Sequence, residues 1–244
     1  MNRYIAKHTE KNLINKSPER IGGKASQLFN INPDLLPNWS VITADCPDDK
    51  LEEVCSEIWK DIGLWLSLYA VRSSAIGEDG KDQSFAGIFE SKLNVPITGI
   101  EHAVREVRDS ANAGRAEAYL KAPSPNVAVI VMPMVKAQYS GVLFSKEPVE
   151  GTDRMLVEWE EGVGGVVDGE SNSNMIFLDS EDFYRSGEIY EKCVELDIPL
   201  YTIWHEAKRL EKNYGRPVDI EWAINEEGRP FVLQVRPITA GVTA

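Results

Sequence analysis

The sequence predicts an α+β protein made of two lobes. Helical and strand patterns both occur along the chain, but they do not alternate in the regular order of a doubly wound parallel sheet. The chain has 244 residues, of which 43% are hydrophobic and 27% charged, so it is long enough to bury a core. Pro123 and Pro125 lie in the segment KAPSPN, which has the composition of a linker. We therefore expect an N-terminal lobe over residues 1–125 and a C-terminal lobe over residues 126–244.

The N-terminal lobe combines glycine turns, helices and a clear strand. The segment RIGGKASQLFN is typical of a glycine turn that enters a short helix. Apolar residues between Leu51 and Ile62 recur at intervals of three and four, which is the spacing of an amphipathic helix. The remaining expected elements are a strand over LYAVRSS (68–74), a polar glycine-containing loop (75–91), and one or two helices (100–121) with a break near Gly114.

The C-terminal lobe begins as a series of strands and ends in a helix followed by a hairpin. The expected strands are VAVIVMPMV (127–135), SGVLFS (140–145), RMLVEWE (154–160) and NMIFLD (174–179). A helix over TIWHEAKRLEKNY is expected to terminate at Gly215. Two segments rich in β-branched and aromatic residues, VDIEWAI and FVLQVR, then flank the turn sequence NEEGRP, which predicts a β-hairpin.

The hairpin register decides which side chains meet. If Asn225 pairs with Pro230, Glu221 lies opposite Gln234 and Asp219 lies opposite Arg236. The other face then carries apolar pairs only: Ile220 with Val235, Trp222 with Leu233, and Ile224 with Phe231. Because side chains alternate along a strand, one face is expected to pack on a core and the other to hold the polar groups.

The polar groups of the hairpin allow two interpretations. The carboxylates of Asp219 and Glu221 and the amide oxygen of Gln234 suit a hard cation such as Mg²⁺. The guanidinium of Arg236 offers a fork of donors that fits phosphate. The alternative is a simple surface salt bridge between Asp219 and Arg236, and the hairpin alone leaves both interpretations open.

Three further segments contain groups suited to a phosphate. Lys24 follows two glycines in IGGKAS, although this string lacks the spacing of a P-loop and often forms a plain turn. Arg72 stands at the end of an apolar strand. At such a position its charged group either faces a cleft, with its aliphatic stem packed, or forms a structural ion pair. The loop SFAGIFES, with Gly87 and Ser91, either donates backbone N–H groups to a triphosphate or forms an ordinary hairpin.

Several functions are disfavoured by composition. A net charge of −13 argues against broad nucleic-acid binding. Three cysteines without metal-ligand spacing indicate a reduced, cytoplasmic protein, and no segment has the pattern of a signal peptide or of a membrane span. None of the three histidines, His8, His102 and His205, lies in a sequence cluster that suggests a metal site or nucleophilic catalysis.

Taken in order, four strings resemble the nucleotide-binding domain of pyruvate phosphate dikinase and phosphoenolpyruvate synthase, which also occurs in rifampin phosphotransferase. The strings are IGGKASQL, YAVRSSAIGEDGKDQSFAGIFES, SGVLFSKEP and DIEWAI…FVLQVRPIT. They cover the chain from about residue 20 to 240. Each string is common by itself, but their combination in this order is specific to the family.

The resemblance implies an ATP-grasp fold with ATP held between two lobes. By that match, Lys24, Arg72 and Arg236 contact phosphates and act in catalysis, and Gly87 and Ser91 belong to a loop over the phosphates. The resemblance further implies the following ligands: Glu221 and Gln234 for Mg²⁺, and Met132 on the adenine side of ATP.

The chain departs from the family pattern in three ways. Met132 stands where the family usually has glutamine, and the family string GLGE occurs here as GVGG, with Gly165 in place of glutamate. The sequence also stops shortly after RPIT, whereas family enzymes continue into a phosphohistidine domain and an acceptor domain such as that for pyruvate. We therefore expect a stand-alone ATP-binding component that is incomplete without a partner chain.

Three functional hypotheses follow. The first is a Mg-ATP-dependent phosphotransferase component that phosphorylates a histidine on a separate partner protein. The second is a self-contained ATP-grasp kinase or ligase that acts on a small molecule. The third is a non-catalytic nucleotide-binding regulatory module. We favour the first, because Lys24, Arg72, Glu221, Gln234 and Arg236 are all present.

Overall fold

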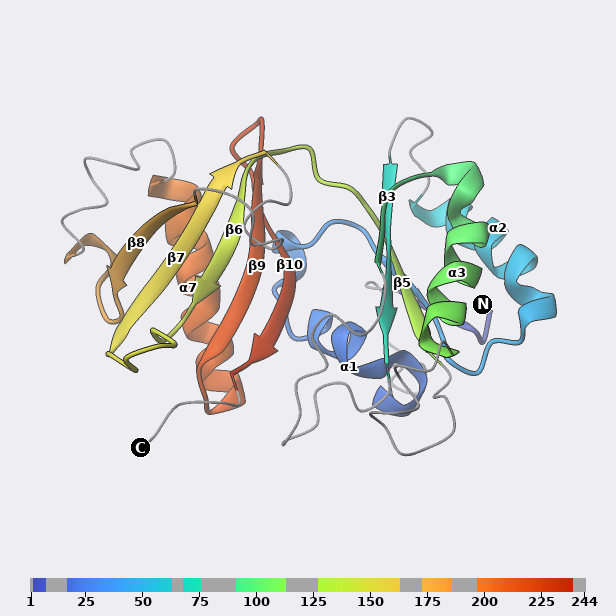
Figure 1. Cartoon of the computed structure of the whole chain (residues 1–244), viewed down its shortest axis with the longest axis horizontal. Helices are drawn as coiled ribbons and strands as arrows, with labels where there is room; N and C mark the ends of the chain where they lie inside the picture. The colour runs from blue at the N-terminus through green and yellow to red at the C-terminus, as the bar shows by residue number, and fades with distance from the viewer. Residues whose placement is uncertain are drawn as a thin grey trace. The chain divides into compact units, whose positions relative to one another are not determined.

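The computed structural model describes residues 2–7, 17–62, 68–75, 91–112, 127–162, 173–185 and 197–238. The chain divides into two compact units. The first unit comprises residues 1–29 and 37–134, and the second comprises residues 30–36 and 135–244. Each unit contains one antiparallel sheet with helices, so the predicted α+β class is confirmed (Figure 1).

The first unit is built on a five-stranded sheet with the order β1-β2-β5-β3-β4. Its strands are β1 (Ile5–Lys7), β2 (Ser40–Ile42), β3 (Leu68–Ser74), β4 (Ser91–Pro96) and β5 (Ala128–Pro133). Its helices are α1 (Pro18–Leu28), α2 (Leu51–Ile62) and α3 (Ile100–Asn112), with short 3₁₀ turns η3 (Asp48–Lys50) and η4 (Ile97–Gly99). Helices α2 and α3 cover one face of the sheet (Figure 1).

The core of the first unit follows from the predicted helix pattern. The buried side chains of α2 are Leu51, Val54, Cys55, Ile58 and Ile62, which recur at intervals of three and four as the sequence predicts. They pack against the apolar face of β3 and β5. Each buried leucine or isoleucine of this kind stabilises the fold by about 1.5–3 kcal/mol.

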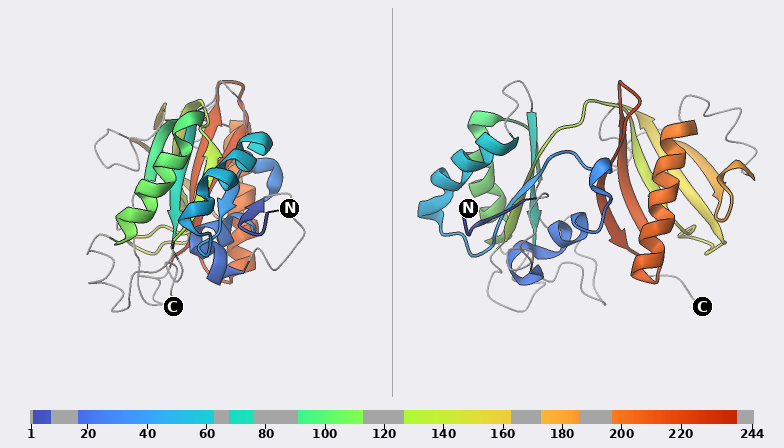
Figure 2. Two further views of the ribbon diagram at one scale, coloured as in Figure 1. Left: turned by 90° about the vertical axis from the view of Figure 1, so that its right-hand side faces the viewer. Right: turned by 180° about the vertical axis from the view of Figure 1, so that it is seen from behind.

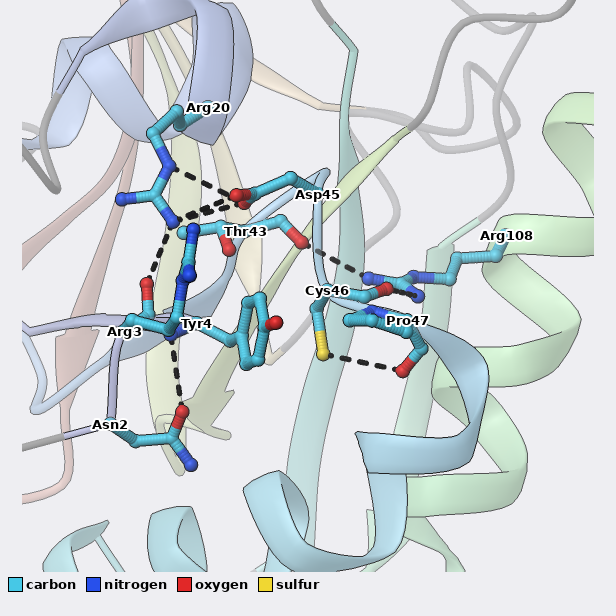
Figure 3. A network of polar contacts seen from close by, with 9 residues as sticks. All are labelled: Asn2, Arg3, Tyr4, Arg20, Thr43, Asp45, Cys46, Pro47 and Arg108. Carbon is cyan, nitrogen blue, oxygen red and sulfur yellow. Dashed lines mark hydrogen bonds and ion pairs between the residues drawn. The ribbon is translucent and has the colours of Figure 1, made fainter.

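Two arginines, Arg20 and Arg108, form hydrogen bonds with the segment between β2 and α2, as Figure 3 shows. Arg20 donates to the Asp45 carboxylate at 3.0 Å and to the backbone oxygen of Arg3 at 2.7 Å. Arg108 donates to the backbone oxygens of Cys46 and Thr43 at 2.8 and 3.1 Å. Burial by itself would raise the pKa of Asp45, but hydrogen bonds from Thr43 and Arg20 and the charge of Arg20 lower it below its usual value.

The second unit is built on a five-stranded sheet with the order β10-β9-β6-β7-β8. Its strands are β6 (Ala137–Phe144), β7 (Arg154–Glu161), β8 (Asn174–Asp179), β9 (Val218–Asn225) and β10 (Pro230–Pro237). Helix α7 (Asp197–Tyr214) runs across one face of this sheet and contacts β10, β9 and β6 (Figure 2). The unit also contains the 3₁₀ turns η2 (Pro33–Leu35) and η5 (Phe183–Arg185).

Most element predictions agree with the structure. The strand over 174–179 has the predicted bounds, and α7 ends directly before Gly215, as predicted. Strands β1, β2 and β4 were not predicted, since β1 and β2 have only three residues each and β4 is mostly exposed. The predicted break of the helix near Gly114 and the linker prolines lie outside the described residues.

The division into units falls nine residues beyond the expected boundary at 125/126. Strand β5 belongs to the first unit, because it lies between β2 and β3 in the sheet of that unit. A short excursion, Asn30–Leu36, belongs to the second unit. The chain therefore crosses between the units three times, after Phe29, after Leu36 and after Met134.

Candidate nucleotide and metal site

The hairpin of β9 and β10 has the predicted register at the end that is remote from its turn. Gln234 pairs with Glu221, and Arg236 pairs with Asp219. Nearer the turn the predicted register is wrong by one residue, because a β-bulge lies between Val232 and Gln234. The consequence is that Phe231 and Val232 pair with Ala223 and Trp222 instead of with the predicted Ile224 and Ala223.

The turn explains the shift in register. Asn225 and Arg229 close a three-residue loop, with the Asn225 N–H donating to the Arg229 oxygen at 3.0 Å. Gly228 has φ +75°, as the last residue of such a loop requires. The Asn225 side chain also accepts from the N–H groups of Glu227 and Arg229 at 3.2 and 2.8 Å. Loop chemistry of this kind sets the register at the turn, and the bulge restores the predicted register beyond it.

Three side chains predicted for metal and phosphate converge on one face of the hairpin, which we call the polar face. Arg236 Nη2 donates to Glu221 Oε1 at 2.7 Å, and Arg236 Nε lies 3.5 Å from Asp219 Oδ1. Glu221 and Gln234 are 9% and 3% exposed. Directly paired residues have Cβ atoms about 4.5–5.5 Å apart, so the carboxylate and the amide are neighbours. The arrangement is a partly buried, charge-compensated cluster.

The opposite face of the hairpin is apolar and packs on α7. Ile220 and Trp222 are 0% and 1% exposed. The buried apolar residues of α7 are Leu200, Ile203, Trp204, Ala207 and Leu210, and the helix also buries the charged residue Glu206. Alternation along β9 therefore places the polar face on the side of the sheet away from α7. Helix α7 thus packs on the face of the hairpin opposite to the polar face.

The polar face fits a magnesium ion. Glu221 contributes carboxylate oxygens and Gln234 one amide oxygen from directly paired positions. Mg²⁺ commonly takes one or two protein carboxylates and completes its shell with waters and phosphate oxygens, so a small oxygen donor set is sufficient. Within the described part of the chain, no three histidine, cysteine, aspartate or glutamate side chains form a larger metal cluster. A hard cation shared with a phosphate is what this donor set suits.

Lys24 lies in α1, which is fastened to the end of β3. Gly22 breaks the helix geometry at φ +73° and ψ 177°. Gly23 N–H donates to the Ala75 oxygen at 2.9 Å, and Ala25 N–H donates to Ser74 Oγ at 3.0 Å. A Cβ on Gly22 would stand 2.1 Å from the Ser74 oxygen, so only glycine permits this approach. The GG string thus serves the close packing of α1 against β3.

Arg72, Ser91 and Met132 share one face of the sheet in the first unit. Arg72 pairs directly with Ser91 of β4 and with Ile130 of β5. Met132 pairs with Ala70, two residues along on the same face. Ser74, which holds α1, also lies on this face, so Lys24 and Arg72 are carried by elements in direct contact. Met132 is only 3% exposed, and Ser91 opens strand β4 instead of ending a loop.

The site residues fall into two sets, one in each unit. The first unit carries the cationic set, Lys24 and Arg72, together with Ser91 and Met132. The second unit carries the metal set, Glu221 and Gln234, together with Arg236. Gly87 and the GVGG string with Gly165 lie outside the described residues. Ser74 and Asp219 contact these sets as well: Ser74 Oγ accepts from the N–H of Ala25, next to Lys24, and Asp219 lies 3.5 Å from Arg236. In the sequence, the hydroxyls after Arg72 and the predicted Asp219–Arg236 pair indicate these two residues.

The two described histidines do not belong to either set. His102 is on α3, with an 80% exposed side chain 3.8 Å from Glu106. His205 is on α7, where its ring packs edge-on against Tyr201 with a centroid distance of 4.5 Å.

The first unit also has a separate hollow of about 400 Å³, which is lined by none of the predicted site residues. Its lining residues are Asn2, Arg3, Tyr4, Lys50, Glu53 and Glu57. None of the described helices is long and apolar enough to cross a membrane.

Comparison with known proteins identifies several sequence relatives of this chain. The chain is 32% identical over 216 residues to the prodigiosin synthesizing transferase PigC of Serratia marcescens, covering 74% of this chain and 23% of that protein. It is 32% identical over 220 residues to a probable phosphoenolpyruvate synthase of Methanothermobacter thermautotrophicus, covering 76% and 31%. A rifampicin phosphotransferase of a Streptomyces species is 30% identical over 207 residues, covering 71% and 24%.

These relatives are much longer proteins, and the chain spans about a quarter to a third of their length. Among solved structures, PH1788 from Pyrococcus horikoshii aligns with a TM-score of 0.47 at 14% identity, covering 77% of this chain and 80% of that one. The family model described as pyruvate phosphate dikinase, AMP/ATP-binding domain, matches residues 38–198 and 196–243. The chain therefore belongs to the pyruvate phosphate dikinase AMP/ATP-binding domain family, as its motifs predicted.

Proposed function

We propose that this chain binds Mg-ATP in an ATP-grasp domain and acts as the ATP-using part of a dikinase-like phosphotransferase. The phosphate passes to a histidine that another domain or a partner protein supplies. The observation that carries the proposal is the cluster on the polar face, where Glu221, Gln234 and Arg236 meet. Oxygen donors for a cation and a fork of donors for a phosphate occur together there.

The roles of the residues follow from their chemistry. Lys24 is a flexible point charge, and Arg72 and Arg236 are planar forks, so together they bind and orient phosphate oxygens. Glu221 and Gln234 hold Mg²⁺, which supplies charge compensation for the phosphates when bound. Met132 lies on the adenine side, and Gly87 and Ser91 belong to the segment beside the phosphates. Positioning and charge stabilisation are the main protein contributions to phosphoryl transfer.

Arg236 has two partners in this scheme. Its guanidinium compensates the carboxylate of Glu221, 2.7 Å away. When Glu221 turns its charge to a cation, the guanidinium becomes available to a phosphate oxygen. The exchange keeps a partly buried carboxylate compensated in both states, which avoids the penalty of an unpaired charge.

The position of the two described histidines outside the predicted site residues supports an acceptor from another domain or protein. His102 and His205 lie on helices outside the two sets of site residues, and His205 is on the side of its sheet that α7 covers. His8 lies outside the described residues.

Calorimetry and labelling test the proposal. The purified chain is titrated with ATP in the presence and absence of Mg²⁺, and we expect binding that depends on Mg²⁺. ATP labelled in its β or γ phosphate is then mixed with the chain and with the proteins encoded beside its gene. A base-stable, acid-labile phosphohistidine on one of these proteins is the expected product. Turnover with small molecules alone would favour a self-contained kinase or ligase, and binding without any turnover would favour a regulatory module.

A further inference from the structure

The hollow of the first unit lies between the N-terminal segment of the chain and helix α2. One wall is formed by residues 2–4, directly before β1, and the other by Lys50 of η3 with Glu53 and Glu57 of α2. Its volume of about 400 Å³ is sufficient for a small organic molecule. All of its lining residues belong to the first unit. The hollow is therefore formed within one compact unit, by residues that have no role in the proposed function.

The N-terminal wall is held in place by hydrogen bonds. Tyr4 N–H donates to Asn2 Oδ1 at 3.1 Å, and the backbone oxygen of Tyr4 accepts the N–H of Thr43 at 2.9 Å. Arg20 Nη2 donates to the backbone oxygen of Arg3 at 2.7 Å (Figure 3). The Tyr4 ring also packs against the apolar core beneath α2. Because this wall is already ordered, a ligand binds without a large entropic cost for arranging it.

The other wall carries three charged side chains on one side of a helix. Lys50, Glu53 and Glu57 follow one another at intervals of three and four, which brings their side chains to the same side of the chain. Lys50 Nζ lies 3.2 Å from Glu53 Oε2, and the two side chains are 49% and 64% exposed. Ion pairs at this exposure are weak, so both groups are also accessible to a ligand.

Two opposite charges of the hollow are not compensated by the described part of the chain. The Arg3 guanidinium lies over the Tyr4 ring, 5.3 Å from its centroid, and forms no ion pair with any described residue. Glu57 is half-buried and likewise has no ion pair within the described ranges. Partial burial of a charge without a partner costs free energy. An open cation and an open anion at one hollow therefore point to a ligand that carries both charges.

The balance of charges decides which ligands fit. The lining carries two cations, Arg3 and Lys50, and two anions, Glu53 and Glu57. The two carboxylates would repel a nucleotide or free phosphate, and the two cations would repel a polyamine. A zwitterion satisfies both kinds of group, because its carboxylate suits the fork of Arg3 and its ammonium suits the carboxylate of Glu57. The Tyr4 ring offers an apolar surface to the carbon atoms of such a ligand.

We propose that this hollow binds a free α-amino acid, which Arg3 recognises by its carboxylate and Glu57 by its ammonium group. The proposal does not rest on the proposed function, since it uses other residues and another class of ligand. Loss of a hydrogen bond to a charged group weakens binding by about tenfold to a hundredfold. Each of the two contacts is expected to contribute a factor of this size to affinity.

Saturation-transfer NMR on the full chain tests for binding. Any affinity tag is placed at the C-terminus, because residues 2–4 line the hollow. Each standard L-amino acid is offered singly, with and without excess Mg-ATP. We expect a signal from at least one amino acid, and the same signal after ATP is added, because no predicted nucleotide residue lines the hollow. Absence of a signal from every amino acid, or displacement of the bound one by ATP, would overturn the proposal.

Chemical derivatives and variants together identify the two contacts. The N-acetyl derivative of the tightest-binding amino acid lacks the ammonium group, and its amide derivative lacks the carboxylate. Calorimetry with the wild type should show that each derivative binds at least about tenfold more weakly than the parent amino acid. Glu57→Gln should remove the penalty of the N-acetyl derivative, and Arg3→Gln should remove that of the amide derivative. Derivatives that bind as tightly as the parent would refute recognition of a zwitterion.

A matched variant controls for general charge effects. Glu52→Gln changes a carboxylate in the first turn of α2 that does not line the hollow, so affinity is expected to stay the same. A loss equal to that in Glu57→Gln would overturn the proposal, and so would penalties that persist in both Glu57→Gln and Arg3→Gln. Thermal melting shows whether each variant folds. If either does not, the relative affinities of the parent and its two derivatives for the wild type decide the question.

Discussion

Arg236 reaches diagonally across the hairpin to Glu221, with Nη2 2.7 Å from Oε1, although its direct partner in the strand register is Asp219. Its Nε remains 3.5 Å from Asp219 Oδ1. One guanidinium therefore lies between two carboxylates. Diagonal neighbours on paired strands are within reach of a long side chain, and the fork of arginine allows it to serve two partners at once.

Removing Arg236 should affect both stability and phosphate binding. Arg236→Ala leaves the carboxylate of Glu221, which is 9% exposed, without its short guanidinium contact. We expect a loss of about 1–3 kcal/mol in the free energy of unfolding, because a partly buried charge loses its partner. Urea denaturation measures the loss. Arg105→Ala, which breaks an exposed helix pair with Glu101, should change stability by less than about 1 kcal/mol.

Removing Glu221 should abolish magnesium-dependent use of ATP while the fold remains. Glu221→Ala deletes the carboxylate donor opposite Gln234. We expect apparent Mg²⁺ affinity to fall by at least about 10–100-fold, since even residues that merely support metal ligands have effects of that size. The measurement is ATP turnover or binding over a series of Mg²⁺ concentrations.

A matched control for this variant lies in the same row of the sheet. Glu158 pairs with Val142, which pairs in turn with Glu221, so the intervening strand β6 separates the two carboxylates. Glu158→Ala is expected to leave the Mg²⁺ dependence unchanged. Equal losses in both variants would argue for a diffuse acidic surface instead of a defined metal site.

The contact of α1 with β3 should not tolerate any side chain at Gly22. Gly22→Ala combines a left-handed backbone at φ +73° with a Cβ 2.1 Å from the Ser74 oxygen. Gly151 also has a positive φ, +67°, but an added Cβ meets nothing within 4 Å. Gly151→Ala should therefore cost only the backbone term, about 1–2 kcal/mol. Thermal melting of both variants should show a clearly larger loss for Gly22→Ala, and equal losses would mean that the close approach is unimportant.

Burial of Cys55 predicts a loss of stability at alkaline pH. Burial raises the pKa of its thiol from 9.0 to about 12. Between these values the unfolded chain has released the proton and the folded chain retains it, so the free energy of unfolding decreases as pH rises from 9.0 to about 12. The contribution is about 1.4 kcal/mol per pH unit within this window.

Comparison with a variant isolates the thiol from other groups that titrate at high pH. Cys55→Ala cannot release a proton, so its stability should decline less steeply than that of the wild type over the same window. Denaturant titrations at several pH values provide the slopes. Parallel slopes for the two proteins would show that the buried thiol does not govern this part of the pH profile.

The sequence predicted the parts of the fold that depend on local patterns. The helix over 51–62 and the strand over 174–179 were found where their apolar spacing placed them. The pairs Glu221–Gln234 and Asp219–Arg236 were also predicted correctly, because the bulge between Val232 and Gln234 offsets the one-residue error in the predicted pairing at the turn. The register near the turn was not, because a bulge inserts a residue without leaving a sign in the alternation.

The short strands β1 and β2 and the edge strand β4 were not predicted, for a different reason. Strands β1 and β2 have three residues each, too few for a periodic pattern, and are stabilised by neighbours distant in sequence. Strand β4 is an edge strand with a mostly exposed pattern, so it lacks the apolar alternation of a strand. Pairing between strands that are far apart in the sequence cannot be predicted from the local sequence pattern of either strand.

By itself, the sequence determined the chemistry of this protein: which side chains are available for phosphate and metal, in which family order they occur, and which residues share a strand face. Only the tertiary structure decided that Arg236 contacts Glu221 as well as Asp219, that Gly22 packs against Ser74, and that Asn30–Leu36 joins the second unit. The physical reason is that residue type and periodicity act over a few residues, whereas these contacts depend on diagonal reach, close backbone approach and hydrogen bonds between segments far apart in the chain.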